Sequence, residues 1–87
     1  MRYQRHPKVA DVAVDGAFTL LEPTSGEYFG LDATGARVWE HLAVPRGMVE
    51  LLDLLVEEYD VEVERCRTDV EELLQSLIDA GLVERLS

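Results

Sequence analysis

Basic residues are scarce in this sequence of 87 residues, in which eight Lys and Arg side chains stand against eighteen Asp and Glu. The formal net charge of −10 argues against nucleic acid and anionic membranes as partners, because both bind cationic protein surfaces that release counterions. A negative surface instead suits a partner that carries basic residues.

Cysteine is scarce, and long apolar runs are absent. The single cysteine, Cys66, excludes an internal disulfide and a thiolate-rich metal site. No stretch approaches the roughly 18 apolar residues that a membrane-spanning helix needs, and Met1–Ala10 lacks the apolar run of a signal peptide. We therefore expect a cytoplasmic protein that forms one domain over residues 1–87, with its core at about 9–86.

The first third of the chain carries the signals of an antiparallel meander. Short runs rich in Val, Leu and aromatic residues predict strands at Val9–Val14, Ala17–Glu22 and Glu27–Leu31. Asp15-Gly16 is a typical hairpin dipeptide, and Pro23–Gly26 is a cluster of turn residues. Together these signals predict a three-stranded antiparallel sheet.

After the third strand the apolar spacing changes from two to about 3.6 residues, which is typical of helices. It predicts helices at about Ala33–Ala43, Met48–Tyr59 and Glu64–Ala80. Trp39 and Val49 are expected on the apolar faces of the first two helices. A short extended tail follows the third. We therefore expect an α+β fold, similar to a winged helix-turn-helix, in which a three-stranded antiparallel sheet precedes three helices.

No constellation of catalytic or metal-ligating residues stands out. His6 and His41 lack a second ligand at a suitable spacing, and Cys66 lies on an apolar stripe, where it is expected to be a small buried hydrophobe. The glycines lack the spacing and the lysine of a phosphate-binding loop. We expect a binding protein without a cofactor or a metal, and not an enzyme.

The winged shape raises DNA binding as an alternative. The third helix offers Arg65, Arg67 and Gln75 for base contacts. Carboxylates on the same helix would repel the phosphate backbone. They are Glu64, Asp69, Glu71, Glu72 and Asp79. Charge therefore disfavours a DNA-binding regulator.

The third predicted strand has the features of a free sheet edge. Tyr28–Leu31 contains neither the charge nor the proline that usually protects such edges, and Gly30 allows another backbone to approach closely. An open edge beside an apolar helix can capture a peptide by strand addition. The same residues also fit an ordinary core strand, since alternation puts Phe29 and Leu31 on one face and Tyr28 on the other. A monomer and an edge-paired dimer both stay open.

An ordered series of motifs runs from about Val12 to Val83. The run Glu22–Leu42, EPTSGEYFGLDATGARVWEHL, combines a glycine turn, an aromatic pair, Gly-Leu-Asp, Thr-Gly-Ala and an aliphatic-Trp pair. The second half continues with Glu58–Val61, Asp69-Val70 and Ala80–Val83. This order resembles the PqqD-like family, although aspartate stands at position 32, where the family commonly has asparagine.

The resemblance implies a recognition element for ribosomally made, modified peptides (RiPPs). In such proteins the leader segment of a precursor peptide adds an antiparallel strand to the third strand, in a groove lined by the third helix. Carried onto this chain, the strand is Glu27–Leu31 and the helical stretch is Arg67–Leu77. The implied peptide-binding residues are Glu27, Tyr28, Phe29, Gly30, Leu31, Arg67, Asp69, Val70, Leu73, Leu74 and Leu77.

The resemblance also implies an adaptor that works with a separate maturation enzyme. This partner is a leader protease in lasso-peptide pathways, and a radical enzyme in the pathway to pyrroloquinoline quinone. The run Tyr28–Gly35 is more similar to the lasso type. Because the chain ends at Ser87 without a fused enzyme, we expect a discrete protein. Arg67 or Asp69 is expected to fix the register by pairing with a charged leader residue.

Overall fold

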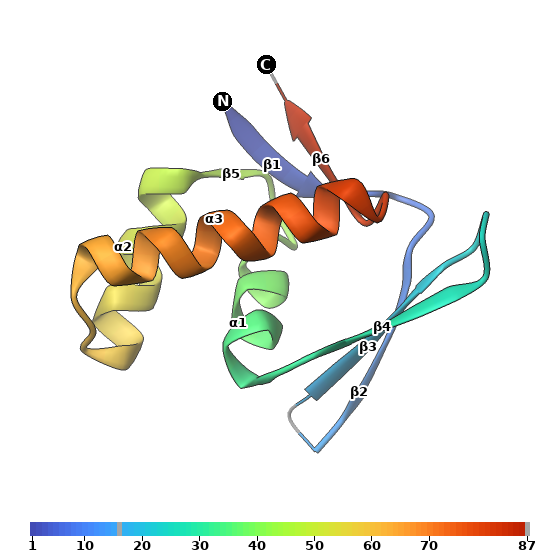
Figure 1. Ribbon diagram of the computed structural model, residues 1–87, viewed down its shortest axis with the longest axis horizontal. Helices are drawn as coiled ribbons and strands as arrows, with labels where there is room; N and C mark the ends of the chain where they lie inside the picture. Colours follow the sequence, from blue (N-terminus) through green and yellow to red (C-terminus); the bar gives the residue numbers. More distant parts are fainter. Residues whose placement is uncertain (16, 87) are drawn as a thin grey trace.

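A computed structural model describes residues 1–15 and 17–86, and within them the chain forms two small antiparallel sheets and three helices (Figure 1). This confirms the predicted α+β class. Gly16 of the predicted hairpin and Ser87 lie outside the described residues. The elements in chain order are β1 (Arg2–Arg5), β2 (Ala10–Val14), β3 (Ala17–Glu22), β4 (Glu27–Leu31), α1 (Ala33–His41), β5 (Arg46–Gly47), α2 (Met48–Tyr59), α3 (Val63–Asp79) and β6 (Val83–Leu86).

The predicted meander is the sheet β2–β3–β4, in which β3 is central and β4 lies at one edge. Leu20 of β3 pairs with Phe29 of β4, and both side chains belong to or pack on the core. Leu31 is also buried, whereas Tyr28 is 72% exposed. The predicted alternation along β4 is therefore confirmed, and the sheet has an inner face toward the helices and an outer face.

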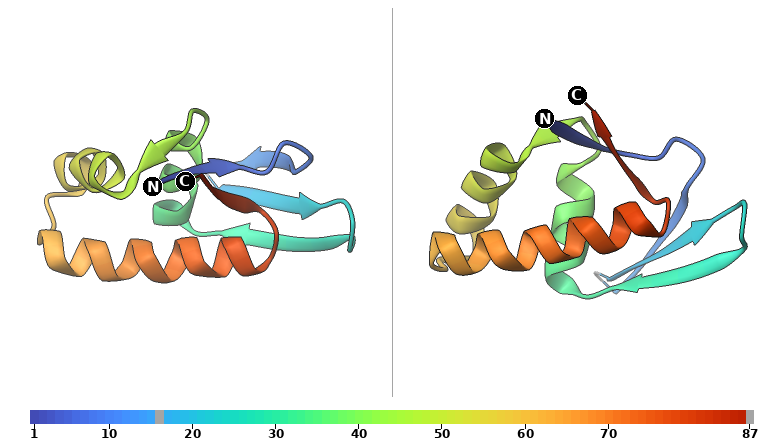
Figure 2. Two further views of the ribbon diagram at one scale, coloured as in Figure 1. Left: turned by 90° about the horizontal axis from the view of Figure 1, so that it is seen from above. Right: turned by 45° about the horizontal axis from the view of Figure 1, so that its top comes forward.

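The second sheet, β5–β1–β6, was not predicted (Figure 2). Its strands come from both ends of the chain, so that Arg2 lies opposite Leu86 and Arg5 lies opposite Val83. The expected C-terminal tail is thus a strand whose partner is β1. No strand was expected before Val9.

The three helices and the inner face of the meander enclose a core around Trp39. Trp39 itself is only 1% exposed. Leu51, Leu52 and Leu55 carry the buried face of α2. Val49 was expected on that face, but it is 67% exposed. The buried residues Leu51, Leu52 and Leu55 share one sector of the helix, and Val49, in the first turn, lies beyond the edge of that sector, so its side chain points to solvent. In the described chain, no helix has the length and hydropathy to cross a membrane.

Candidate functional site

β4 presents an open edge, since its only sheet partner in the described residues is β3. In antiparallel pairing, alternate residues point their N–H and C=O groups away from the neighbouring strand. Gly30 has an ordinary backbone conformation, and a Cβ added there would meet no atom within 4 Å. The fold itself therefore does not require glycine at this edge position.

A hollow of about 200 Å³ opens at the end of β4, between the start of α1 and the middle of α3. Asp32 caps α1, because its Oδ1 accepts a hydrogen bond of 2.8 Å from the backbone N–H of Gly35. A Cβ at Gly35 would lie 3.2 Å from that oxygen, so glycine keeps this turn tight. Thr34 lines the hollow from α1, and Asp69 and Leu73 line it from α3.

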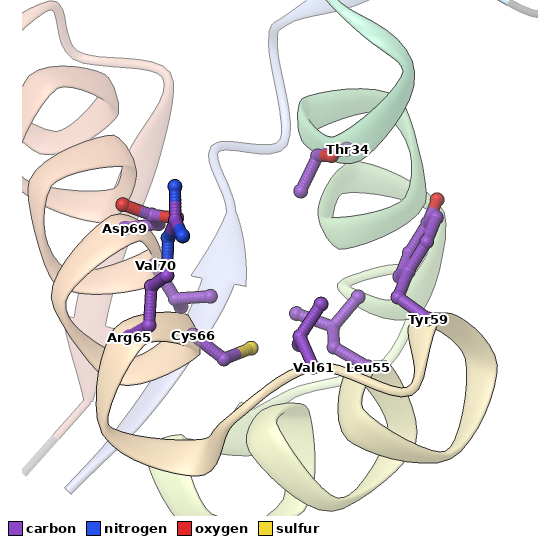
Figure 3. Close-up of a pocket in the computed structure, with 8 residues that line it drawn as sticks. All are labelled: Thr34, Leu55, Tyr59, Val61, Arg65, Cys66, Asp69 and Val70. Atoms are coloured by element: carbon purple, nitrogen blue, oxygen red, sulfur yellow. The ribbon is translucent and has the colours of Figure 1, made fainter.

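A second pocket, also of about 200 Å³, adjoins the first and shares Thr34 and Asp69 with it. It lies where α1, the end of α2 and the start of α3 meet (Figure 3). Figure 3 shows Thr34 facing Cys66 and Leu55 across the pocket, with Arg65 and Asp69 along the α3 side. The lining residues are Thr34, Leu55, Tyr59, Val61, Arg65, Cys66, Asp69 and Val70. We call the β4 edge with the two hollows the β4–α3 groove.

The groove combines an apolar floor with charged groups at its mouth. Burial, with a smaller contribution from the charge of Asp69, raises the pKa of the Cys66 thiol, so the thiol stays protonated at neutral pH. Arg67 pairs with Glu64 at 3.8 Å, a weak contact because both groups are solvent-accessible. No three His, Cys, Asp or Glu side chains among the described residues are grouped to hold a metal ion. This arrangement suits binding of a chain with apolar side chains.

The predicted peptide-binding residues of α3 differ in exposure. Asp69 is exposed and Leu73 is half-buried, and both line the first hollow. Val70, Leu74 and Leu77 are only 1–3% exposed and belong to the core, although Val70 also lines the second pocket. Asp69 and Leu73 are thus the α3 residues from this set that a bound chain can reach in the first hollow. Their contact with a leader stays a prediction.

Several lining residues of the second pocket were not predicted as site residues. Tyr59 and Val61 are 40% and 41% exposed, although both are large and apolar. Tyr59 is the last residue of α2 and Val61 lies in the link to α3, and acidic residues flank both, so a purely solvated segment has no reason to carry them. Apolar residues among these acidic residues were the signal in the sequence that could have identified Tyr59 and Val61 as site residues.

The chain is similar to one protein family and to several solved structures. The family model described as Coenzyme PQQ synthesis protein D (PqqD) matches residues 18–83. No curated protein matches the chain. The solved structure of TbiB1 in complex with the TbiA(beta) leader peptide is 30% identical, with a TM-score of 0.88 and coverage of 97% of this chain and 98% of that chain.

Two further solved structures have the same fold. Lasso peptide synthetase B1, complexed with the leader peptide, is 26% identical, with a TM-score of 0.81 over 95% of this chain and 98% of that chain. The PqqD truncation of Methylobacterium extorquens PqqCD, a stand-alone RiPP recognition element, is 19% identical. Its TM-score is 0.80, over 97% of this chain and 89% of that chain.

Proposed function

The chain belongs to the PqqD family, and from that premise we propose that it binds the leader segment of a ribosomally made precursor peptide and presents it to a maturation enzyme. The observation that carries the proposal is the open β4 edge beside two connected hollows. Solved structures of other proteins also support the proposal. TbiB1 and lasso peptide synthetase B1 share the fold and form complexes with leader peptides.

The leader adds to β4 as an antiparallel strand, with main-chain hydrogen bonds supplying affinity and side-chain pockets supplying selectivity. The antiparallel direction determines which end of the leader strand lies beside each end of β4. The N-terminal end of the added strand lies beside Leu31 and its C-terminal end lies beside Glu27. Leader residues that precede the strand therefore reach the two hollows, whereas the core peptide leaves past the turn between β3 and β4.

An apolar leader side chain fits the second pocket, whose floor is formed by Leu55, Cys66 and Val70. Asp69 borders both hollows and Arg65 borders the second, so charged leader residues can pair there and fix the register. The net charge of −10 attracts a basic leader over longer distances, an effect that salt screens.

The maturation enzyme we propose is the leader protease of a lasso-peptide pathway. The support is that lasso peptide synthetase B1 is 26% identical to this chain, whereas the PqqD truncation is 19% identical. A radical enzyme of quinone cofactor biosynthesis is the second candidate, favoured by the description of the matching family model. Either role makes the chain a non-catalytic adaptor that raises the effective concentration of the precursor at the enzyme.

The test is isothermal titration of the protein with a synthetic leader from the precursor encoded next to it. Titrations at about 0.05 M and about 0.5 M salt separate contact from long-range attraction. We expect saturable one-to-one binding that weakens with salt, and no binding of a scrambled leader of equal charge. Equal affinity for the scrambled peptide, or no heat and no spectral change with the true leader, would contradict the proposal.

A further inference from the structure

The outer face of the meander is free of charge across all its described side chains. The strand register places Ala10, Leu21 and Tyr28 in one row across the sheet. Val12, Thr19 and Gly30 form the next row, and Ala17 follows. In a sequence with 30% charged residues, a solvent-facing sheet surface normally alternates polar residues with the core positions.

This face is open to solvent. Val12 is 59% exposed and Tyr28 is 72% exposed. The helices all lie on the opposite side of the meander (Figure 1). Gly30 belongs to the same face, where the space for a Cβ is empty. Neither the packing nor the backbone of the free chain accounts for these residues, so a binding surface is the simplest physical reason for them.

The outer face continues directly into the edge that takes the leader, because both include β4. A strand added to β4 extends the sheet, and every second leader side chain then projects from the outer face beside Tyr28 and Gly30. A protein that covers this face contacts the chain and its bound leader together. It can therefore distinguish the loaded chain from the empty one.

A second copy of the chain fits this face poorly. Each copy carries a net charge of −10, so association of two copies is opposed by their mutual repulsion. The maturation enzyme must meet the chain while the leader is bound, and it needs an uncharged apolar patch to match the face.

We propose that the outer face of β2–β3–β4, centred on Val12, Thr19 and Tyr28, is the docking surface for the maturation enzyme. This inference rests on the proposed function. The bound leader contributes its outward side chains to the same surface. Docking there leaves the two hollows of the groove free, because the first lies between the start of α1 and the middle of α3 and the second lies between α1, α2 and α3.

The test separates docking from leader binding with the variant Val12→Lys. Val12 lies on β2, two strands and about 10 Å from β4, so a charge there does not reach the groove. The matched control is Val49→Lys, the same change at a similarly exposed valine on α2. Each protein is titrated with the synthetic leader, and then, with and without leader, with the purified leader protease encoded beside the precursor.

We expect both variants to bind the leader within twofold of the parent protein, while Val12→Lys alone weakens protease binding by roughly tenfold. Equal protease affinity for all three proteins would overturn the docking surface, as would a sedimentation experiment showing a dimer that Val12→Lys dissociates. If the parent protein fails to bind the leader, the proposed function is wrong. In that case the protease titration without leader still decides whether this face is used.

Discussion

The indole N–H of Trp39 donates a hydrogen bond of 2.7 Å to Oδ2 of Asp11 and so joins α1 to β2. Arg5, on β1, also contacts Trp39. Its guanidinium lies 4.6 Å from the centre of the indole ring, and its Nε donates a 2.9 Å hydrogen bond to the Trp39 carbonyl. One buried side chain thus connects both sheets to the first helix.

Replacing Trp39 with alanine should lower the free energy of unfolding by about 3–5 kcal/mol, because it empties a large core position and removes the indole hydrogen bond to Asp11. Urea denaturation followed by circular dichroism measures the change. A Trp39→Ala protein of normal stability that had lost only leader binding would show that Trp39 belongs to the site rather than to the core.

Replacing Gly30 with proline should abolish leader binding, because the ring crowds the β4 edge and removes a backbone donor. Gly30→Ala is the control, since its Cβ meets no atom within 4 Å in the free protein. Circular dichroism verifies that the proline variant is folded. Leader affinity that stays unchanged in the folded variant would sink strand addition.

A synthetic leader methylated at successive backbone nitrogens tests the same interaction without changing the protein. Strand addition predicts a period of two, since alternate leader residues turn their N–H groups toward β4. Methylation at those positions should prevent binding, and methylation at the others should have little effect. A uniform response along the leader would indicate another binding mode.

Leu73 and Leu74 are neighbours with different surroundings, so alanine at each should have a different effect. Leu73→Ala should weaken leader binding by about 1–2 kcal/mol, because Leu73 lines the hollow. Leu74 is 2% exposed in the core, so Leu74→Ala should instead lower the free energy of unfolding by about 2–5 kcal/mol. Titration and urea denaturation of both variants check this assignment. The assignment would be wrong if Leu74→Ala weakened leader binding and Leu73→Ala lowered the free energy of unfolding.

Cys66 provides a chemical reporter for the second pocket, because it is the only thiol in the chain and lines that pocket. Its raised pKa makes alkylation by iodoacetamide slow and faster at higher pH. A saturating leader should slow the reaction several-fold further, whereas a scrambled leader should not. An alkylation rate that the true leader leaves unchanged would show that the pocket stays empty.

The turn between β3 and β4 should become less stable in acid. Backbone N–H groups of Ser25 and Thr24 donate to the Glu22 carboxylate and lower its pKa from 4.5 to about 2. Because the folded pKa is depressed, the stabilisation is complete above about 4.5 and is lost as the pH falls toward about 2. Unfolding free energies measured across this window should fall less steeply for Glu22→Gln than for the parent. Glu57→Gln, at an exposed site on α2, serves as the control, and identical slopes for all three would contradict the assignment.

Local signals in the sequence were sufficient to predict the meander and the helices, because turn residues and apolar spacing act between near neighbours. They were insufficient for β1 and β5. The run Arg2–Arg5 has no apolar alternation, and its strand state depends on pairing with β6 at the other end of the chain. Its Arg5 is half-buried because it stacks on Trp39, which is a tertiary contact.

The site was predicted as a set of elements rather than as individual contacts. The absence of charge and proline from Tyr28–Leu31 indicated the open β4 edge, and helical spacing placed Leu73, Leu74 and Leu77 near one another. Spacing along α3 cannot tell which of them the neighbouring elements cover. That depends on where α1 and α2 pack, and those positions also create the pocket around Tyr59 and Val61.

The pairing of β1 with β6 also bears on the order in which the protein folds. Gln4 and Glu84, which are hydrogen-bonded across these strands, are separated by 80 positions in the chain. Closing so large a loop costs more entropy than forming the short turns of the meander. The ladder of the two chain ends should therefore form late, after the meander and helices have assembled, and hydrogen exchange should find it among the first parts to open.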